Sequence, residues 1–381
     1  MTGLNELAPV AIASAFGFGM ILAICGSLKE CLSQKMEIPQ ERVAGWLSYG
    51  PLILIPLVFL SGLLTDRWGP RGMLVAGSLL AGIGLFGLTF SREVWTTWLG
   101  LIAVVAGASA LSTGAVVVFP DAYLGYNAAS ANLGLVFWSL GGLVTGSLVP
   151  LILRRLEVRR ALSLLAIICL IPAFVATLTS AGAFHFKAAE ENPAEIWSSS
   201  VFWLVALAFL LYCPLEGSLS TWAVKYLAQL GYSERHAGLL VGSFWLTFVA
   251  SRLGAAYFEY YHVDGSEPWV IITLACLSAI AIAGLAGTYH RTHAVLWLLL
   301  IGLVLGPVFP NLIGILYRHF GEGEMGSAYG AMILIGGAGS LIFPPLMSAY
   351  ATRTSLRVAF RLPTVISILL AGGCLALALA K

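Results

Sequence analysis

Charged side chains are what this sequence has least of. Only 38 of its 381 residues are Asp, Glu, Lys or Arg, which is 10% of the chain, whereas soluble domains carry roughly 25%. The chain is 59% hydrophobic and its mean hydropathy is +0.92. Because so few charged side chains cannot cover a water-soluble surface, lipid must cover much of the protein. The formal net charge of +2 also provides no basic field of the kind that nucleic-acid binding requires.

The usual signatures of enzymes, metal sites and cofactors are missing as well. The six cysteines form no CxxC pair, and five lie in apolar stretches, which is typical of small buried packing residues. No G-x-x-x-x-G-K-S/T loop is present, so ATP does not drive the protein directly. The six histidines fall in loops or at the ends of apolar runs, which argues against a histidine proton relay. We therefore expect no enzymatic activity, no cofactor and no metal.

Long apolar runs dominate what is present. A membrane-spanning helix needs about 20 mostly apolar residues, and twelve candidates meet that length. The N-terminus has no Lys or Arg before the first run, so we expect this run to remain as a helix and not to be cleaved. The expected spans are 8–28, 43–64, 72–90, 95–119, 129–152, 161–180, 201–226, 237–258, 269–288, 294–317, 327–350 and 360–380.

A polar segment divides these spans into two sets of six. Residues 181–200 read AGAFHFKAAEENPAEIWSSS and lie near the middle of the chain. The simplest organisation is a six-helix bundle over 1–180, a cytoplasmic linker over 181–200 and a second six-helix bundle over 201–381. The predicted fold class is therefore an all-α integral membrane protein with twelve transmembrane helices.

The two halves carry an internal repeat. VFPD at 118–121 is matched by VFPN at 308–311, and the pair Gly141-Gly142 with Pro150 is matched by Gly336-Gly337 with Pro345. The two offsets, 190 and 195 residues, agree with six helices per repeat. Internal symmetry of this kind is common in transporters.

The loop between the second and third spans reads GLLTDRWGPR and contains Gly62, Asp66, Arg67, Gly69 and Arg71. Asp66 can accept hydrogen bonds from the N-terminus of a neighbouring helix, and the arginines can pair with carboxylates or helix C-terminal carbonyls. Gly69 permits a tight turn. These groups can latch two helices together in one conformation and release them in another. The segment resembles the G-x-x-x-D-R-x-G-x-R signature of the major facilitator superfamily, which implies two pseudo-symmetric six-helix bundles.

Looser patterns spread over most of the chain resemble the fucose-type sugar/proton symporters and their relatives. The matching segments are 119–121 with 131–133 and 137–142, then Tyr212, Glu216, Trp222 and Tyr226, then 244–245 with 251–252, and 309–311. Those carriers place acids in the first and fourth helices. Here the first span has no acid and the fourth reads GAVV at 114–117.

Glu216 is the leading candidate for a coupling residue, because it lies in the middle of the seventh span. A charge at that depth costs about 2.5–3.5 kcal/mol on insertion scales and normally faces a cavity or a partner. The resemblance implies that helices one, four, seven and ten line a central cavity, and aromatic and polar groups there can hold a solute. The expected substrate-binding residues are Tyr212, Glu216, Asn132, Trp138, Trp222, Trp245 and Asn311.

Arg252 near the end of the eighth span joins the loop residues as a gating candidate, either pairing with the tenth or eleventh helix or extending toward the membrane surface. The resulting hypothesis is a monomeric secondary transporter of a sugar or related polar metabolite, coupled to protons through Glu216. The alternatives are a proton-driven exporter of hydrophobic compounds or lipids, and an uncoupled facilitator. The resemblance implies the inner membrane with both termini cytoplasmic. Most basic residues, including Arg159 and Arg160, would then lie outside, opposite to the positive-inside rule.

Overall fold

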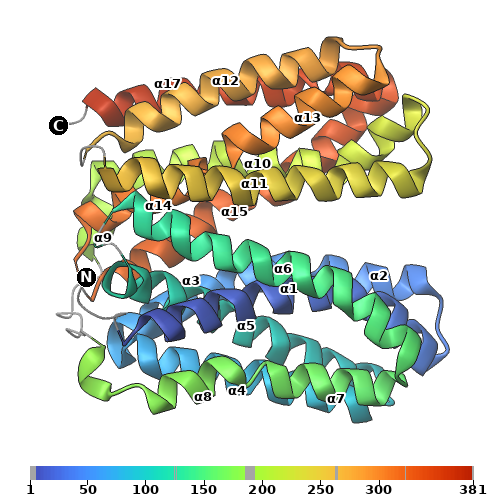
Figure 1. The fold of residues 1–381 in the computed structure, drawn as a ribbon, viewed down its shortest axis with the longest axis vertical. Coiled ribbons are helices and arrows are strands. Elements are labelled where there is room, and N and C mark those ends of the chain that lie inside the picture. Colours follow the sequence, from blue (N-terminus) through green and yellow to red (C-terminus); the bar gives the residue numbers. More distant parts are fainter. Residues whose placement is uncertain are drawn as a thin grey trace. The chain divides into compact units, whose positions relative to one another are not determined.

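Every secondary-structure element in the described part of the chain is a helix. The computed structural model describes residues 6–123, 125, 127–184, 194–261, 265–321 and 323–379. These form two compact units, which Figure 1 shows as groups of long helices. The first unit comprises Met1–Gly125, Gly134–Pro193 and Phe320–Gly330, and the second comprises Tyr126–Leu133, Ala194–His319 and Ala331–Lys381. Residues 185–193 of the expected linker lie outside the described residues.

The predicted spans coincide with the observed helices, which confirms the fold class. Eleven helical segments of the described chain are long and apolar enough to cross a bilayer, and a shorter apolar stretch covers Ala8–Ile24. The first half contains α1 (Ala8–Met36), α2 (Gln40–Ser48), α3 (Gly50–Trp68), α4 (Pro70–Phe90), α5 (Val94–Ala122), α6 (Ala128–Arg155), α7 (Val158–Ile168) and α8 (Ile171–Leu178). The second contains α10 (Ser200–Gln229), α11 (Glu234–Tyr261), α12 (Glu267–Gly287), α13 (Arg291–Leu305), α14 (Val308–His319), α15 (Met325–Arg353), α16 (Leu356–Ala359) and α17 (Arg361–Leu379), with short η1 (Ala181–Ala183) and α9 (Ala194–Ser198) before it.

Three of the expected spans, 43–64, 161–180 and 294–317, are built from two consecutive helices, and the short helix α16 directly precedes the last span. Proline lies at or near each of these four breaks. Pro51 is in the first turn of α3, Pro172 is in the first turn of α8, Pro307 separates α13 from α14, and Pro363 follows the start of α17. Proline has no backbone N–H and clashes with the preceding turn of a helix. A break inside lipid is tolerated only where protein groups satisfy the freed carbonyls.

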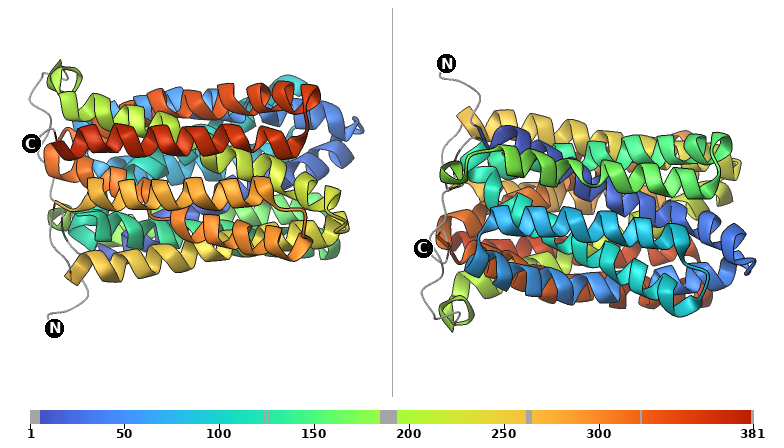
Figure 2. Two further views of the ribbon diagram at one scale, coloured as in Figure 1. Left: turned by 90° about the horizontal axis from the view of Figure 1, so that it is seen from above. Right: turned by 90° about the horizontal axis from the view of Figure 1, so that it is seen from below.

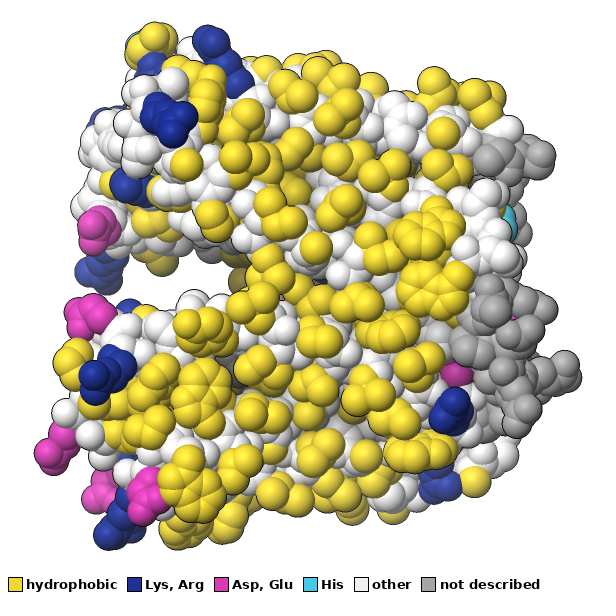
Figure 3. Space-filling model, turned by 180° about the vertical axis from the view of Figure 1, so that it is seen from behind, with side chains coloured by type: hydrophobic (Ala, Val, Ile, Leu, Met, Phe, Trp, Pro, Cys, Tyr) yellow, Lys and Arg dark blue, Asp and Glu magenta, His cyan; other side chains and the backbone are white. Residues whose placement is uncertain are grey.

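The helix sides are apolar, and the charges lie near the helix ends. In Figure 3 hydrophobic side chains cover most of the surface in view, and Lys, Arg, Asp and Glu gather toward the ends of the helices. Large side chains such as Ile83, Phe174, Leu239 and Ile342 are exposed on the helix sides. A continuous apolar surface of this kind requires a lipid environment.

Glycine brings α4 and α5 into backbone contact in the first unit. The helices of each unit run nearly parallel in the two views of Figure 2. A Cβ atom added at Gly77 would lie 2.9 Å from the carbonyl oxygen of Gly107, and one added at Gly84 would lie 2.8 Å from that of Gly100. Small residues one or two turns apart allow membrane helices to approach closely, and dispersion then stabilises the pair.

The beginnings of α6 and α15 belong, by their contacts, to a different unit from the rest of each helix. Residues Tyr126–Leu133, which begin α6, belong by their contacts to the second unit. Residues Phe320–Gly330, which begin α15, belong to the first unit. A Cβ atom at Gly314 of α14 would lie 2.6 Å from Cβ of Ala128, and one at Gly330 of α15 would lie 2.8 Å from Cα of Phe59 on α3. Each exchange is therefore held by a close helix contact.

We expect Gly107→Ala to lower the stability of the protein by about 1–3 kcal/mol, because the added methyl overpacks a full interface. Its Cβ would lie 2.5 Å from both Gly77 O and Ala81 N. Gly87→Ala is the matched control, since a Cβ there meets nothing within 4 Å. Thermal unfolding of the detergent-solubilised protein measures both. Equal melting temperatures for the two variants would contradict the close-packing interpretation.

Candidate functional site

A tyrosine and a carboxylate share one face of α10. Tyr212 is buried, and its hydroxyl donates a 2.9 Å hydrogen bond to Oε2 of the half-buried Glu216. The two residues are one helical turn apart, so their side chains point the same way. Pro214 between them leaves the carbonyl of Leu210 without its helical donor. Gly339 of α15 packs there, because a Cβ at that position would lie 2.5 Å from this oxygen.

Arg252 of α11 brings a buried positive charge to this group. Its side chain is 6% exposed, and it interacts electrostatically with Tyr212 and Glu216, including a hydrogen bond with Tyr212. Nε donates a 3.0 Å hydrogen bond to the carbonyl of Gly306. That carbonyl would normally accept from the residue four positions later, which is Pro310 and has no N–H. The arginine therefore replaces a missing helical hydrogen bond and does not extend toward the membrane surface.

Aromatic rings surround the Tyr212–Glu216–Arg252 group. The ring of Phe309 on α14 stacks on Tyr212 at 6.3 Å with an interplanar angle of 13°. The guanidinium of Arg252 lies 5.3 Å from the ring centroid of Phe248, and Trp245 packs 5.1 Å from the same ring. Stacked rings and a cation over a ring exclude water and hold the charged groups in place. The site thus combines an acid, a fixed cation and flat apolar faces.

A second carboxylate, Glu259, lies two turns beyond Arg252 on α11. Oε1 of Glu259 accepts a 2.7 Å hydrogen bond from Nδ2 of Asn311, and Oε2 accepts a 2.8 Å hydrogen bond from Nδ2 of Asn132. Both asparagines are fully buried. Asn132 lies in the second turn of α6 and Asn311 in the first turn of α14, and both helices meet α11 at this point. Two of the expected substrate-binding residues are therefore brought together by an acid that the sequence analysis did not select.

Glu259 was missed because the eighth span was expected to end at residue 258. The surrounding sequence, Tyr257-Phe258-Glu259-Tyr260-Tyr261, has the composition of a membrane-interface belt. The helix continues to Tyr261. The available signal was the acid itself, since a single carboxylate at the end of an apolar span needs a partner.

In the first unit, Asp66 caps the start of α15. Its Oδ1 accepts from the N–H of Gly326 at 2.8 Å, and its Oδ2 accepts from the N–H of Ser327 at 2.6 Å. Helix N-termini leave these N–H groups without intrahelical partners and carry a partial positive charge. The contact depends on Gly62, where a Cβ atom would lie 2.2 Å from the carbonyl of Gly326.

The remaining residues of this loop have distinct surroundings. Gly69 has φ = 83°, a conformation that favours glycine, and it ends α3 and begins α4. Arg71 donates to the carbonyls of Ala176, Thr177 and Thr179 at 3.1–3.2 Å, so it caps the C-terminus of α8. Arg67 is exposed, and its guanidinium makes no hydrogen bond to another described residue.

Two of the expected tryptophans have aromatic or cationic neighbours of their own. Trp138 belongs to the first unit, where its ring packs edge-on at 4.0 Å against Phe18 of α1. Trp222 lies ten residues, or nearly three turns, beyond Tyr212 on α10. Its Nε1 is buried without a hydrogen-bond partner in the described residues, and the ammonium of Lys225 lies 5.5 Å from its ring.

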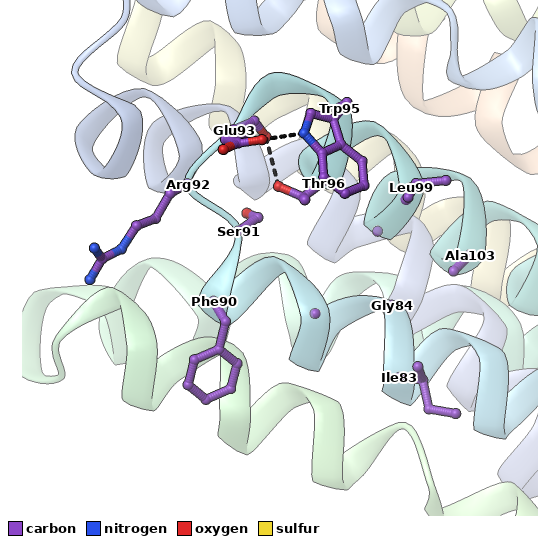
Figure 4. Close-up of a pocket in the computed structure, with 12 residues that line it drawn as sticks. Ile83, Gly84, Phe90, Ser91, Arg92, Glu93, Trp95, Thr96, Leu99 and Ala103 are labelled. Carbon is purple, nitrogen blue, oxygen red and sulfur yellow. Dashed lines mark hydrogen bonds between the residues drawn. The ribbon is translucent and has the colours of Figure 1, made fainter.

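A separate hollow of about 560 Å³ lies where α4 ends and α5 begins (Figure 4). The exposed side chains of Ile83, Phe90, Trp95 and Leu99 line it. Trp95 Nε1 donates to the Glu93 carboxylate at its rim. Its charged lining residues, Arg92 and Glu93, lie in the short connection between the two helices. The rest of the lining is mostly apolar and exposed, so the hollow is not the candidate site.

Three comparisons with known proteins agree with this architecture. Among solved structures, the E. coli fucose:proton symporter FucP matches with a TM-score of 0.77 and 14% identity, over 98% of this chain and 99% of that one. A bacterial homologue of the iron transporter ferroportin also gives 0.77 at 14% identity, over 99% and 100%. The human organic anion transporter MFSD10 gives 0.75 at 13% identity, over 97% and 98%. At such identities the likeness shows the fold alone.

Among curated proteins, Bypass of stop codon protein 6 from Saccharomyces cerevisiae (strain ATCC 204508 / S288c) is 22% identical over 165 residues, or 41% of this chain. That match spans about a third of the yeast protein, 33% of its length. The family model described as Major Facilitator Superfamily matches residues 7–344, nearly the whole chain. This chain therefore belongs to the major facilitator superfamily.

Proposed function

We propose that this protein is a secondary active transporter that moves a small polar organic solute, most simply a sugar or related metabolite, by alternating access. The observation that carries the proposal is the Tyr212–Glu216–Arg252 group on α10 and α11, in which Tyr212 and Arg252 are buried and Glu216 is half-buried. Charges inside membrane spans are rare and normally serve a solute or ion path. Hydroxyl, carboxylate and guanidinium groups can bind solute hydroxyls, and Phe309 and Phe248 supply apolar faces.

Proton coupling through Glu216 follows from the chemistry of this group. When Glu216 is ionised, it balances the charge of Arg252. When it binds a proton, Arg252 loses that partner and can pair with a solute group instead. The proton and the solute then stabilise the same conformation, which is the condition for symport. Two structural neighbours, the fucose:proton symporter FucP and the proton:xylose symporter XylE, are named for such coupling.

The organisation that accompanies this function is also proposed. Six-helix halves over 1–180 and 201–381 rock about the site, with 181–200 as a cytoplasmic linker. The protein works as a monomer in the inner membrane with both termini in the cytoplasm, and it catalyses no covalent reaction. Asp66, Arg67, Arg71 and Arg252 act as gating residues.

The first prediction concerns Glu216 in proteoliposomes. With an inward proton gradient and a panel of monosaccharides, nucleosides and amino acids, we expect one solute class to acidify the lumen. Glu216→Gln should abolish this acidification while retaining exchange of labelled solute, because a neutral amide keeps the hydrogen bonds but carries no proton. Glu234→Gln, at an exposed position of α11, is the matched control.

The outcomes of this assay separate the alternatives. Solute entry without acidification, unchanged by Glu216→Gln, would make the protein an uncoupled facilitator. No movement of any panel member, together with proton-driven extrusion of hydrophobic dyes or labelled lipid, would make it an exporter.

The second prediction concerns the pairing of Arg252 with Glu216. Arg252→Gln should lower the free energy of unfolding by about 3 kcal/mol, since it leaves a carboxylate without its cation. Combining it with Glu216→Gln should recover a large part of that loss, whereas Arg235→Gln at an exposed position should have little effect. Thermal unfolding in detergent measures the double-mutant cycle. Strictly additive effects of the two substitutions would show that the groups are not coupled.

A further inference from the structure

The hollow where α4 ends and α5 begins is an apolar trough in the helix sides (Figure 4). Gly84 and Gly100 bring the two helices together at its floor, since a Cβ atom on Gly84 would lie 2.8 Å from the carbonyl oxygen of Gly100. A Cβ atom added at Gly87 would meet nothing within 4 Å, so the trough is open there. Large exposed apolar side chains line both helices, namely Ile83 and Phe90 on α4 and Trp95 and Leu99 on α5.

A lipid acyl chain is the occupant that suits this trough. Its volume of about 560 Å³ lies in the range of roughly 300–1,000 Å³ that is usual for ligand pockets. It opens on the apolar helix sides, where the surrounding molecules are lipids. Because those lipids are as apolar as the trough, an acyl chain alone gains little by entering it. Any preference for one lipid must therefore come from groups that bind its headgroup.

Three basic side chains from three different parts of the first unit gather at the charged end of the trough. The ammonium of the half-buried Lys35, at the end of α1, donates a 3.4 Å hydrogen bond to Oγ of Ser91, which lines the trough. The charges of Arg92 and Arg159 both act on this ammonium. Among the described residues, no carboxylate forms an ion pair with any of the three. Like charges held close together repel one another, and a bound anion relieves that repulsion.

Acidic residues are fewer at this end of the first unit. The α4–α5 and α6–α7 connections, within 91–93 and 154–160, carry five arginines and two glutamates. The carboxylate of Glu93 accepts a hydrogen bond from the indole N–H of Trp95. The trough therefore ends in a net positive region, at the opposite end of α4 from the Asp66 loop. Basic pockets between membrane helices favour anionic lipid headgroups.

We propose that this trough binds one anionic phospholipid, with an acyl chain between α4 and α5 and the phosphate group at Lys35, Arg92 and Arg159. The planar guanidinium groups suit a phosphate because they can donate two parallel hydrogen bonds to it. With both termini in the cytoplasm, these basic residues lie outside, against the positive-inside rule, and the lipid balances their charge. The site goes beyond the proposed function and depends on neither the solute nor the proton.

Native mass spectrometry of the full-length protein in neutral detergent tests the headgroup. The probes are phosphatidylglycerol and phosphatidylcholine with identical acyl chains. We expect one phosphatidylglycerol to bind at least about tenfold more tightly than phosphatidylcholine. Arg92→Gln combined with Arg159→Gln should remove most of this preference, because two of the three positive charges are lost. Arg235→Gln, at an exposed position of α11, is the matched control and should leave the preference unchanged.

A second pair of variants tests the acyl chain. Gly87→Leu should weaken the binding of both lipids, because the leucine side chain fills the open part of the trough. Gly146→Leu is the control, since it lies on an exposed side of α6 where a Cβ atom also meets nothing within 4 Å. Thermal unfolding without lipid verifies that every variant is folded. Added phosphatidylglycerol should raise the melting temperature of the parent protein more than that of either trough variant, since a bound ligand stabilises the folded state.

Three results would overturn the lipid site. Equal affinity for the two lipids, or a preference that survives the loss of Arg92 and Arg159, would show that these charges bind no headgroup. Lipid binding that Gly87→Leu leaves unchanged would show that no acyl chain lies in the trough. Displacement of phosphatidylglycerol by an equal concentration of glycerol phosphate would identify a site for a free anion instead.

Discussion

The hydrogen bond from Arg252 to the carbonyl of Gly306 is the contact on which the second unit depends most. Pro310 cannot donate to that carbonyl, and lipid offers no replacement donor. The arginine satisfies it and is itself held by Tyr212 and Glu216 on α10. One side chain thus stabilises the break between α13 and α14 and brings three spans together. The residues proposed to bind the solute and the proton therefore also stabilise the fold of the second unit.

Glycine has a comparable role in the first unit. At Gly77, Gly84, Gly107 and Gly62 the missing side chain lets backbones meet. Without a hydrophobic force between helices in lipid, such close packing is a main source of helix association. At Gly62 the close approach also delivers Asp66 to the N–H groups of α15. In this loop the hydrogen bonds of Asp66 therefore depend on the close backbone packing at Gly62.

Each repeat carries an acid at the end of its second span, but the two acids bind different groups. Asp66 binds bare backbone N–H groups, whereas Glu259 binds two asparagine amides. The second arrangement recruits α14 in addition to α6, because Asn311 stands where the first repeat has Asp121. An acid at that position would repel Glu259. The single change from aspartate to asparagine within the repeated VFP segment is what makes a three-helix contact possible.

The sequence by itself determined the membrane class, the twelve spans, the repeat and the superfamily, because hydropathy and the Asp66-Arg67 loop are local signals. It also selected Glu216, Tyr212 and Arg252, since isolated polar groups in apolar runs are conspicuous. Only the tertiary structure joined Asn132 and Asn311 to Glu259. Residues 132, 259 and 311 come from different spans, and no periodicity within one helix reveals which faces meet. Those pairings are set by close helix packing, which hydropathy does not encode.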